Sequence, residues 1–348
     1  MKTKVLSIIL LGASLGLGSC SDYLDMTPTD RASDKLVWSK LDYAEQAVND
    51  FYRYIDYLGV YRDGQCLAGM TEALTDQLKY GSYNYMAKCQ IPSEIAYGGS
   101  VLTVNYVSTY LGNWGTMYEY VRRVNEGINK LKKYASFNQT DEERLEAEMR
   151  FFRAYFYFEK VKRYGDIPWY DKALDSDDPE LYKARDSREF VMQKMLEDLD
   201  FAIANLPKTK NAYVLTRWTA LALKSRVCLF EGTFRKYHGL EDYEKYLNAC
   251  VSASETFMNE SGYTLYKSGS TPYRDLFASI NLQADEVIFG RDYEASLSVL
   301  HNVQNYENST TMGRPGMNKK IVNSYLMADG SRFTDKAGYE TMTFDQEC

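Results

Sequence analysis

The chain has 348 residues, of which 45% are hydrophobic and 26% charged, and only 7 are proline. This composition is globular and excludes the disordered, collagen-like and multi-span membrane classes. The net charge of −7 argues against a nucleic-acid-binding surface, because such surfaces carry a basic excess. Only two histidines are present, so no metal site or histidine-based catalytic triad is expected, and no P-loop or dinucleotide fingerprint points to a cofactor.

The N-terminus has the pattern of a bacterial lipoprotein signal. Two lysines precede an apolar run at residues 5–17, which suits a signal peptide but is shorter than the ~20 residues of a membrane-spanning helix. Small residues lead directly to Cys20, as in a lipobox, whose cysteine carries acyl chains such as palmitate. We expect a signal peptide at 1–19 and a lipid-anchored tether at 20–39, with an ordinary cleaved signal as the alternative.

Helical periodicity dominates the body of the chain. The expected helices cover residues 41–58, 67–79, 114–134, 140–164, 186–205, 217–234 and 242–259. Thr140 and Glu143 form a capping-box pattern, Thr216 is a second N-cap, and Gly165 ends the fourth helix. The best strand candidate is Glu286 to Gly290.

Helices joined by short connections predict antiparallel pairs. We therefore expect a mostly all-α fold, a tetratricopeptide-like α-solenoid with degenerate repeats and irregular ligand-binding loops. Small residues on the sixth helix allow a neighbouring helix to approach closely; they are Ala222, Ser225 and Gly232.

Five cysteines remain after Cys20, an odd number without CxxC spacing, so neither a redox motif nor a complete disulfide framework is indicated. Cys228 and Cys250 lie in helical patterns and are expected to be buried small hydrophobic residues. A disulfide bridge remains an open alternative.

An ordered set of short motifs resembles the SusD/RagB family of nutrient-binding outer-membrane lipoproteins. Residues 146–158 read EAEMRFFRAYFYF and residues 163–168 read RYGDIP, similar to the family's "ExRFLRAxxYF" and "RxGDVP" segments. The further matches, in the family's order, are Trp114, Tyr118 and Asn125, then AIANLP at 202–207, TRWTALALKSRV at 216–227, EVIF at 286–289 and YLMADG at 325–330.

This resemblance implies a lipid-anchored protein on the cell surface, with no catalytic activity of its own. It implies a SusC-like TonB-dependent transporter as partner, over whose mouth the protein acts as a lid. It also implies a SusD-like helical domain over residues 40–348. The family continues beyond the segment at 325–330, so we expect the C-terminal part of the domain to be missing after Cys348. The motif residues Trp114, Arg153, Asp166 and Pro168 are interpreted as scaffold.

Two segments outside these motifs have the chemistry of a sugar-binding loop. Residues 80–114 hold six tyrosines and only two charged side chains, and residues 291–316 are rich in Tyr and Asn. Aromatic planes stack on the apolar faces of sugar rings, while amides and phenols bond the hydroxyls. For each residue, packing or solvent exposure is the alternative role. The candidate ligand-binding residues are Tyr80, Tyr83, Asn84, Tyr85, Tyr97, Asn105, Tyr106, Arg291, Tyr293, Asn305 and Tyr306.

The sequence therefore predicts a non-enzymatic surface lipoprotein of the outer membrane that binds oligosaccharides and delivers them to the transporter. A peptide-binding uptake lipoprotein is the first alternative. A protein-docking scaffold and a glycoside hydrolase are weaker ones. The carboxylate pair Glu72 and Asp76 is the only support for the hydrolase, and such pairs arise by chance on acidic helices.

Overall fold

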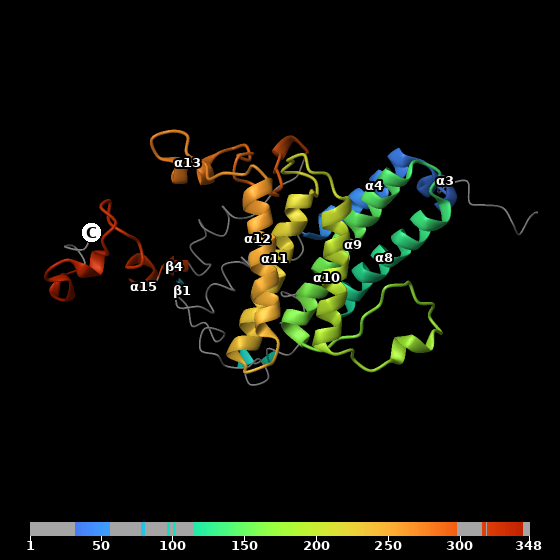
Figure 1. The fold of residues 1–348 in the computed structure, drawn as a ribbon, viewed down its shortest axis with the longest axis horizontal. Coiled ribbons are helices and arrows are strands. Elements are labelled where there is room, and N and C mark those ends of the chain that lie inside the picture. The colour runs from blue at the N-terminus through green and yellow to red at the C-terminus, as the bar shows by residue number, and fades with distance from the viewer. Residues whose placement is uncertain are drawn as a thin grey trace, which may run out of the picture.

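Long helices form the main body of the computed structural model, which describes residues 32–55, 78–80, 96–97, 100–101, 114–297, 315–317 and 319–343 (Figure 1). Successive helices pack on each other in the order α8, α9, α10, α11 and α12. Their bounds are Trp114–Tyr134, Gln139–Tyr164, Arg188–Asn205, Arg217–Tyr237 and Tyr243–Glu260. The prediction of a mostly helical fold built from neighbouring helix pairs is confirmed.

Two short helices precede this array, α3 at Asp34–Ser39 and α4 at Leu41–Asn49, and a 3₁₀ turn, η1, follows at Asp50–Tyr52. Ser33 caps α3 by accepting a hydrogen bond from the Leu36 amide at 3.2 Å. Trp38 is buried, and α3 packs against α8. Residues 34–39, which the sequence assigns to the tether, form α3, and Trp38 joins the hydrophobic core.

Helix α9 runs through the middle of the array and packs against α4, α8, α10 and α11. Its N-cap is Asn138, whose side chain accepts from the Asp141 amide at 2.9 Å. The predicted capping box at Thr140 and Glu143 was therefore wrong, because the helix begins one residue before Thr140. Gly165 ends the helix with a φ of 68°, a conformation that favours glycine, as predicted.

Local signals set the limits of α10 and α11. The Ser187 side chain accepts from the Phe190 amide at 3.3 Å, so α10 begins at Arg188, slightly later than expected. Thr216 and Thr219 form the reciprocal bonds of a capping box at the start of α11, which confirms the Thr216 prediction.

Helices α11 and α12 approach closely where the sequence predicted it. A Cβ atom at Gly232 would lie 2.6 Å from Leu247 Cδ2, so only glycine fits there without a shift of its neighbour. The Ser225 hydroxyl lies 2.8 Å from that of Ser254. Ala222 instead lines a cavity on another face of α11.

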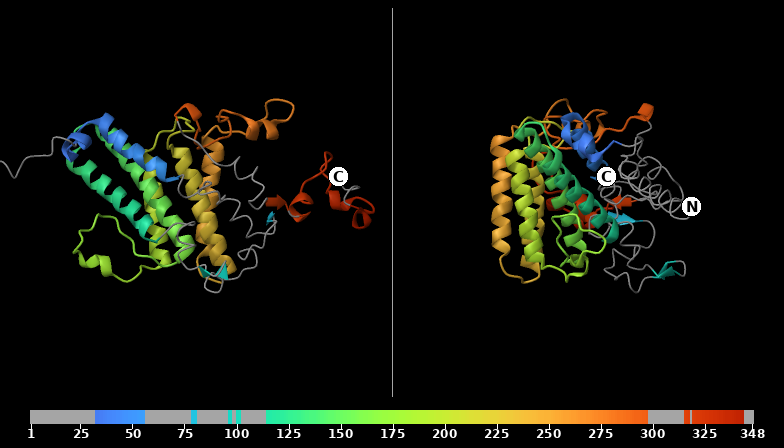
Figure 2. Two further views of the ribbon diagram at one scale, coloured as in Figure 1. Left: turned by 180° about the vertical axis from the view of Figure 1, so that it is seen from behind. Right: turned by 90° about the vertical axis from the view of Figure 1, so that its right-hand side faces the viewer.

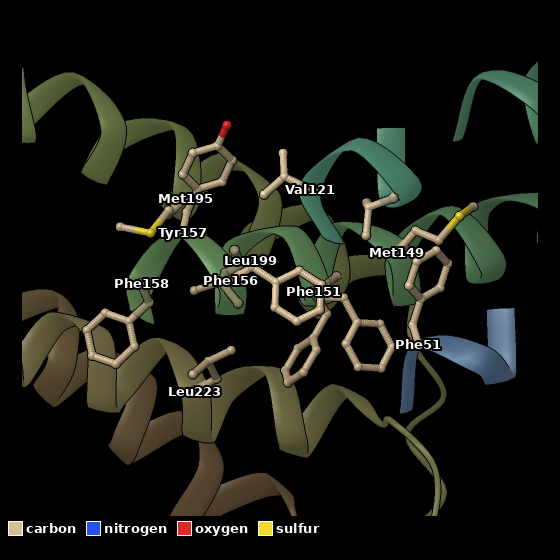
Figure 3. Close-up of a cluster of buried hydrophobic side chains, with 14 of the residues drawn as sticks. Phe51, Val121, Met149, Phe151, Phe156, Tyr157, Phe158, Met195, Leu199 and Leu223 are labelled. Carbon is tan, nitrogen blue, oxygen red and sulfur yellow. The ribbon is translucent and has the colours of Figure 1, made fainter. Parts of the chain in front are cut away.

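Aromatic side chains of α9 fill the centre of the hydrophobic core (Figure 3). Because this helix is covered on several sides, Phe151, Phe152, Phe156 and Phe158 are all buried. Buried residues of η1, α8, α10 and α11 belong to the same cluster; those labelled in Figure 3 include Phe51, Val121, Met195, Leu199 and Leu223. Most of the tyrosines and phenylalanines of this helix therefore serve packing.

A buried ion pair crosses this core between α9 and α10. The Arg153 guanidinium donates two hydrogen bonds of 2.7 Å to the Asp198 carboxylate and one of 2.8 Å to Asn125 Oδ1. Asn125 in turn donates to the backbone carbonyl of Tyr170 at 2.9 Å. These contacts agree with the interpretation of Arg153 as a scaffold residue.

A second polar cluster joins the start of α10 to α11 and α12. Glu189 accepts from Tyr246 Oη at 2.9 Å and from Lys245 Nζ at 3.0 Å, and it pairs with Arg235 at 2.7 Å. Desolvation opposes ionisation of Glu189. The hydrogen bonds from Lys245, Tyr246 and Gln193 and the charge of Arg235 outweigh it and lower the pKa of this carboxyl.

The described residues after α12 are mostly irregular, and residues 319–343 lie apart from the helical array (Figure 2). The elements here are α13 at Pro272–Ala278, η5 at Ala295–Leu297, α15 at Lys319–Val322, η6 at Phe333–Asp335 and η7 at Tyr339–Thr341. The predicted strand from Glu286 to Gly290 was wrong. Its amides bond to the turn residue Gln283 and to the carbonyl of Ala212, so no neighbouring strand pairs with it.

The described strands are short and lie elsewhere. β1 at Leu78–Tyr80 pairs antiparallel with β4 at Pro315–Met317, and β2 at Ala96–Tyr97 pairs with β3 at Ser100–Val101. The helix predicted over 67–79 is wrong at its end, because residues 78 and 79 belong to β1; residues 67–77, with Glu72 and Asp76, lie outside the described residues.

Cys228 and Cys250 both carry free thiols. Cys228 is fully buried, as predicted, and burial raises its thiol pKa to about 12. Cys250 is only partly buried and lies 3.5 Å from the Ser225 hydroxyl. The open alternative of a bridge between these two cysteines is therefore not realised.

Within the described ranges, no helix combines the length and the apolar character needed to cross a bilayer. The same residues hold no group of three or more His, Cys, Asp and Glu side chains arranged to bind a metal ion.

Candidate functional site

A cleft opens where the loop between α10 and α11 meets the irregular chain after α13. One part, of about 300 Å³, lies between the end of the η1 region and residues 289–292; the adjoining part, of about 370 Å³, lies against α9 and α11. Ile55 and Phe289 line both parts, and we call the whole the Phe289 cleft. The first part is lined by Tyr52, Arg53, Ile55, Tyr213, Phe289, Gly290, Arg291 and Asp292.

Tyr52 is fixed in the floor of this cleft by two hydrogen bonds. Its hydroxyl donates to Glu148 Oε2 at 2.7 Å and accepts from the Leu215 amide at 2.9 Å. Burial and the adjacent Glu148 carboxylate raise the pKa of Tyr52, so its hydroxyl remains protonated. Burial likewise raises the pKa of Glu148, although its oxygens also accept from Arg144 at 3.1 Å.

A backbone contact between distant segments helps to hold the opposite wall. The Gly290 amide donates to the Ala212 carbonyl at 2.8 Å, which joins residues 286–292 to the loop between α10 and α11. Phe289 enters the cleft beside Tyr52, with ring centroids 6.1 Å apart. A side chain at Gly290 would collide with Leu282, because the distance from its Cβ to Leu282 Cδ1 would be 2.8 Å.

Polar groups gather at the rim of the cleft. Tyr213 is 48% exposed, and its hydrogen bond to the Asp292 carboxylate raises its pKa. Arg53 pairs with Asp50 at 3.0 Å, and the Arg291 guanidinium lies 5.5 Å from the centre of the Tyr293 ring. The cleft thus combines aromatic surfaces with guanidinium donors and carboxylate acceptors, a combination that suits a hydroxyl-rich ring.

The structure places four of the predicted ligand residues. Arg291 lines the cleft, whereas Tyr293 lies beside Arg291 and is not among the lining residues. Tyr80 lies in β1, where it pairs with Pro315, and Tyr97 lies in β2, where it pairs with Ser100. The remaining predicted residues lie outside the described residues; they are Cys20, Tyr83, Asn84, Tyr85, Asn105, Tyr106, Asn305 and Tyr306.

The pairing of β1 with β4 joins the two segments that the sequence singled out. β1 ends at Tyr80, where the first Tyr-rich segment begins, and β4 contains the end of the second. Tyr80 and Pro315, more than two hundred residues apart in the chain, are therefore paired neighbours. The sequence alone indicated each segment but not their contact.

Sequence reasoning missed several lining residues, above all Tyr52, Tyr213 and Asp292. Tyr52 follows the helical pattern of its segment and was indistinguishable from a packing residue. Tyr213 could have been found from the sequence, because an aromatic residue in the polar loop between Pro207 and Thr216 is a candidate for ligand contact.

Comparisons with known proteins agree with this architecture. Two curated relatives are a SusD-like protein of Formosa agariphila, 25% identical over 79% of this chain and 50% of its own, and one of Bacteroides ovatus, 24% identical over 84% and 50%. The chain thus spans about half the length of the curated relatives it matches.

Solved structures show the same fold. A SusD-like protein of Bacteroides fragilis superposes with a TM-score of 0.62 at 22% identity, covering 88% of this chain and 56% of that one. A SusD-like carbohydrate-binding protein of the same species gives 0.64 at 17% identity, covering 89% and 58%. The SusD-like family model, described as starch-binding and associating with the outer membrane, matches residues 22–229. The chain belongs to the SusD-like family.

Proposed function

We propose that this protein is a non-enzymatic, surface-exposed lipoprotein that binds oligosaccharides in the Phe289 cleft. The observation that carries the proposal is the composition of the cleft, in which Tyr52, Tyr213 and Phe289 lie next to Arg53 and Arg291. Aromatic rings stack on the apolar faces of sugars, and guanidinium and carboxylate groups bond their hydroxyls. Membership of the SusD-like family supports the same class of ligand.

The predicted Tyr-rich segments extend this site. Tyr80, the first residue of one segment, pairs directly with Pro315 near the end of the other. Arg291 already belongs to both the second segment and the cleft. We infer that the tyrosines and asparagines of these segments enlarge the sugar-binding surface of the cleft.

Delivery to a transporter completes the proposed function. Acylation of Cys20 anchors the protein to the outer membrane, and a SusC-like TonB-dependent transporter receives the glycan beneath the protein, which serves as its lid. This step is supported by the family's association with the outer membrane. Replacing Cys20 by Ala should release the protein from the membrane fraction. A co-expressed transporter should still co-purify with the protein when Tyr52 or Tyr213 of the cleft is replaced.

Titration calorimetry against a panel of neutral oligosaccharides tests the binding site. Tyr213→Ala should weaken the affinity about tenfold, equivalent to about 1.4 kcal/mol. The matched control is Tyr237→Ala, because Tyr237 is 82% exposed at the end of α11 and lines neither part of the cleft. Binding of peptides but of no glycan would favour the peptide-uptake alternative, and hydrolysis of a labelled oligosaccharide by the pure protein would refute the non-enzymatic proposal.

A further inference from the structure

A second cavity, of about 600 Å³, lies between the first half of α8 and the loop of residues 165–187 that joins α9 to α10. It shares no lining residue with the Phe289 cleft. In Figure 1 this loop lies below α8, whereas the chain that walls the Phe289 cleft lies at the other end of the helices, near α13. The volume falls within the ~300–1,000 Å³ range of small-molecule sites.

One wall of this cavity is a row of aromatic rings. Trp114 and Tyr118 meet edge to face with centroids 5.3 Å apart, and Tyr118 and Tyr170 do the same at 5.7 Å. The Tyr118 hydroxyl donates to the Pro168 carbonyl at 2.7 Å, which fixes the central ring. The buried ammonium group of Lys160 lies 3.7 Å from the centre of that ring and donates to the Trp114 carbonyl at 2.8 Å. The wall is therefore held in place before any ligand arrives.

Positive side chains of the loop line the cavity, and two carboxylates of the loop, Glu180 and Asp186, lie beside them as ion-pair partners. The loop of residues 165–187 contains three cationic side chains, and all three, Lys172, Lys183 and Arg185, line the cavity. It also contains seven carboxylates, none of which does. Arg122 of α8 adds a fourth cation, and the one carboxylate in the lining, Glu119, pairs with Arg123 at 2.7 Å.

The four cations differ in their partners. Arg122, Lys172 and Lys183 each pair with a carboxylate at 2.8 Å, in partly exposed bridges that contribute little and that a ligand anion is able to replace. Arg185 has no carboxylate partner among the described residues. Its guanidinium lies 5.2 Å from the centre of the Trp114 ring, and among the described residues it donates to the backbone carbonyls of Tyr164 and Asp166, at 3.5 and 3.4 Å.

We propose that this cavity binds a carboxylate-bearing sugar, the uronic acid unit of an acidic oligosaccharide. The sugar ring packs on the wall formed by Trp114, Tyr118 and Tyr170. Its carboxylate pairs with Arg185, whose planar guanidinium suits two parallel hydrogen bonds to a carboxylate. Lys183 adds a second positive charge to the cavity lining, where its ammonium lies 4.9 Å from the centre of the Tyr170 ring. This inference extends the proposed sugar-binding function to a separate site with a different preference.

Calorimetric titration of the full chain with trigalacturonate, and with the neutral galactose trimer as its uncharged counterpart, tests this proposal. The acidic trimer should bind, and the binding should weaken about tenfold or more in Arg185→Gln and fall as salt is added. Arg274→Gln is the matched control, because it removes the same charge from the exposed helix α13. Thermal unfolding should show that both variants remain folded.

Three outcomes would overturn the proposal. The first is that trigalacturonate does not bind, or binds no more tightly than the neutral galactose trimer. The second is trigalacturonate binding that Arg291→Gln reduces and Arg185→Gln does not, which would place the acidic sugar in the Phe289 cleft. The third is Arg185-dependent binding of a polyglutamate peptide without binding of the sugar, which would identify an acidic protein as the occupant.

Tyr213→Ala separates the two proposals. It should weaken the binding of neutral sugars in the Phe289 cleft about tenfold and leave trigalacturonate binding unchanged. Failure of one site is then visible independently of the other.

Discussion

Deleting the hydroxyl of Tyr52 should destabilise the whole helical domain, although the residue lies in the floor of a cleft. Tyr52→Phe keeps the ring and removes one oxygen atom. That oxygen accepts the Leu215 amide at 2.9 Å and donates to Glu148 at 2.7 Å. It therefore joins the end of the η1 turn to α9 and to the chain that enters α11.

The magnitude follows from the two groups that lose their partner. Leu215 is 1% exposed, so its amide finds no water, and an unsatisfied buried amide costs about 1–3 kcal/mol. Glu148 retains its hydrogen bond from Arg144, so losing the tyrosine donor adds only about 1 kcal/mol. We expect Tyr52→Phe to lower the free energy of unfolding by about 2–4 kcal/mol.

Urea denaturation followed by circular dichroism measures this loss from the shift of the transition midpoint at constant slope. Tyr43→Phe is the matched control, because Tyr43 is 42% exposed and the same change there should alter stability by less than about 0.5 kcal/mol. A Tyr52→Phe protein as stable as Tyr43→Phe would refute the argument that this hydroxyl holds the segments together.

Three further predictions concern the helical scaffold. Asp198→Ala leaves the Arg153 guanidinium buried without its carboxylate and should cost about 3–5 kcal/mol in urea denaturation, and a loss below about 1 kcal/mol would contradict this reading of the pair. The pKa of Glu189 is lowered from 4.5, so its contribution is present above that pH and is lost as the pH falls through the folded-state pKa. The stability advantage of the native protein over Glu189→Gln should therefore shrink with acidification below pH 4.5 in melting experiments. An advantage that grew on acidification would contradict a lowered pKa for Glu189. Cys228, with a thiol pKa near 12, should resist alkylation at neutral pH while Cys250 reacts, as peptide mass spectrometry of the folded protein will show; equal labelling would contradict the burial of Cys228.

The sequence determined the features that arise between residues close together in the chain. Helices α8, α10, α11 and α12 lie within a few residues of the predicted ranges, because apolar spacing acts over one or two turns. Thr216 caps α11 and Gly165 ends α9 for equally local reasons. The ordered family motifs depended on this scaffold and identified the family correctly.

Errors at the sequence level came from competition between equally plausible local choices. Asn138 and Thr140 both have side chains suited to an N-cap. In the structure α9 begins at Gln139, so Asn138 is the N-cap and Thr140 lies inside the helix. Residues 286–290 have the composition of a strand, but a strand needs a partner, and here the amide of Gly290 bonds instead to Ala212 in a loop.

Only the tertiary structure decided which side chains form the two cavities. Tyr52, Tyr213 and Phe289 come from three distant parts of the chain, and nothing in their spacing predicts that they meet. The loop of residues 165–187 reads as acidic in sequence, yet its folding turns all three cations toward the cavity beside α8 and leaves its carboxylates out of the lining. Helix formation is governed by neighbours along the chain, whereas a binding site is governed by long-range packing, and for this reason the sequence determined the scaffold and the fold determined the sites.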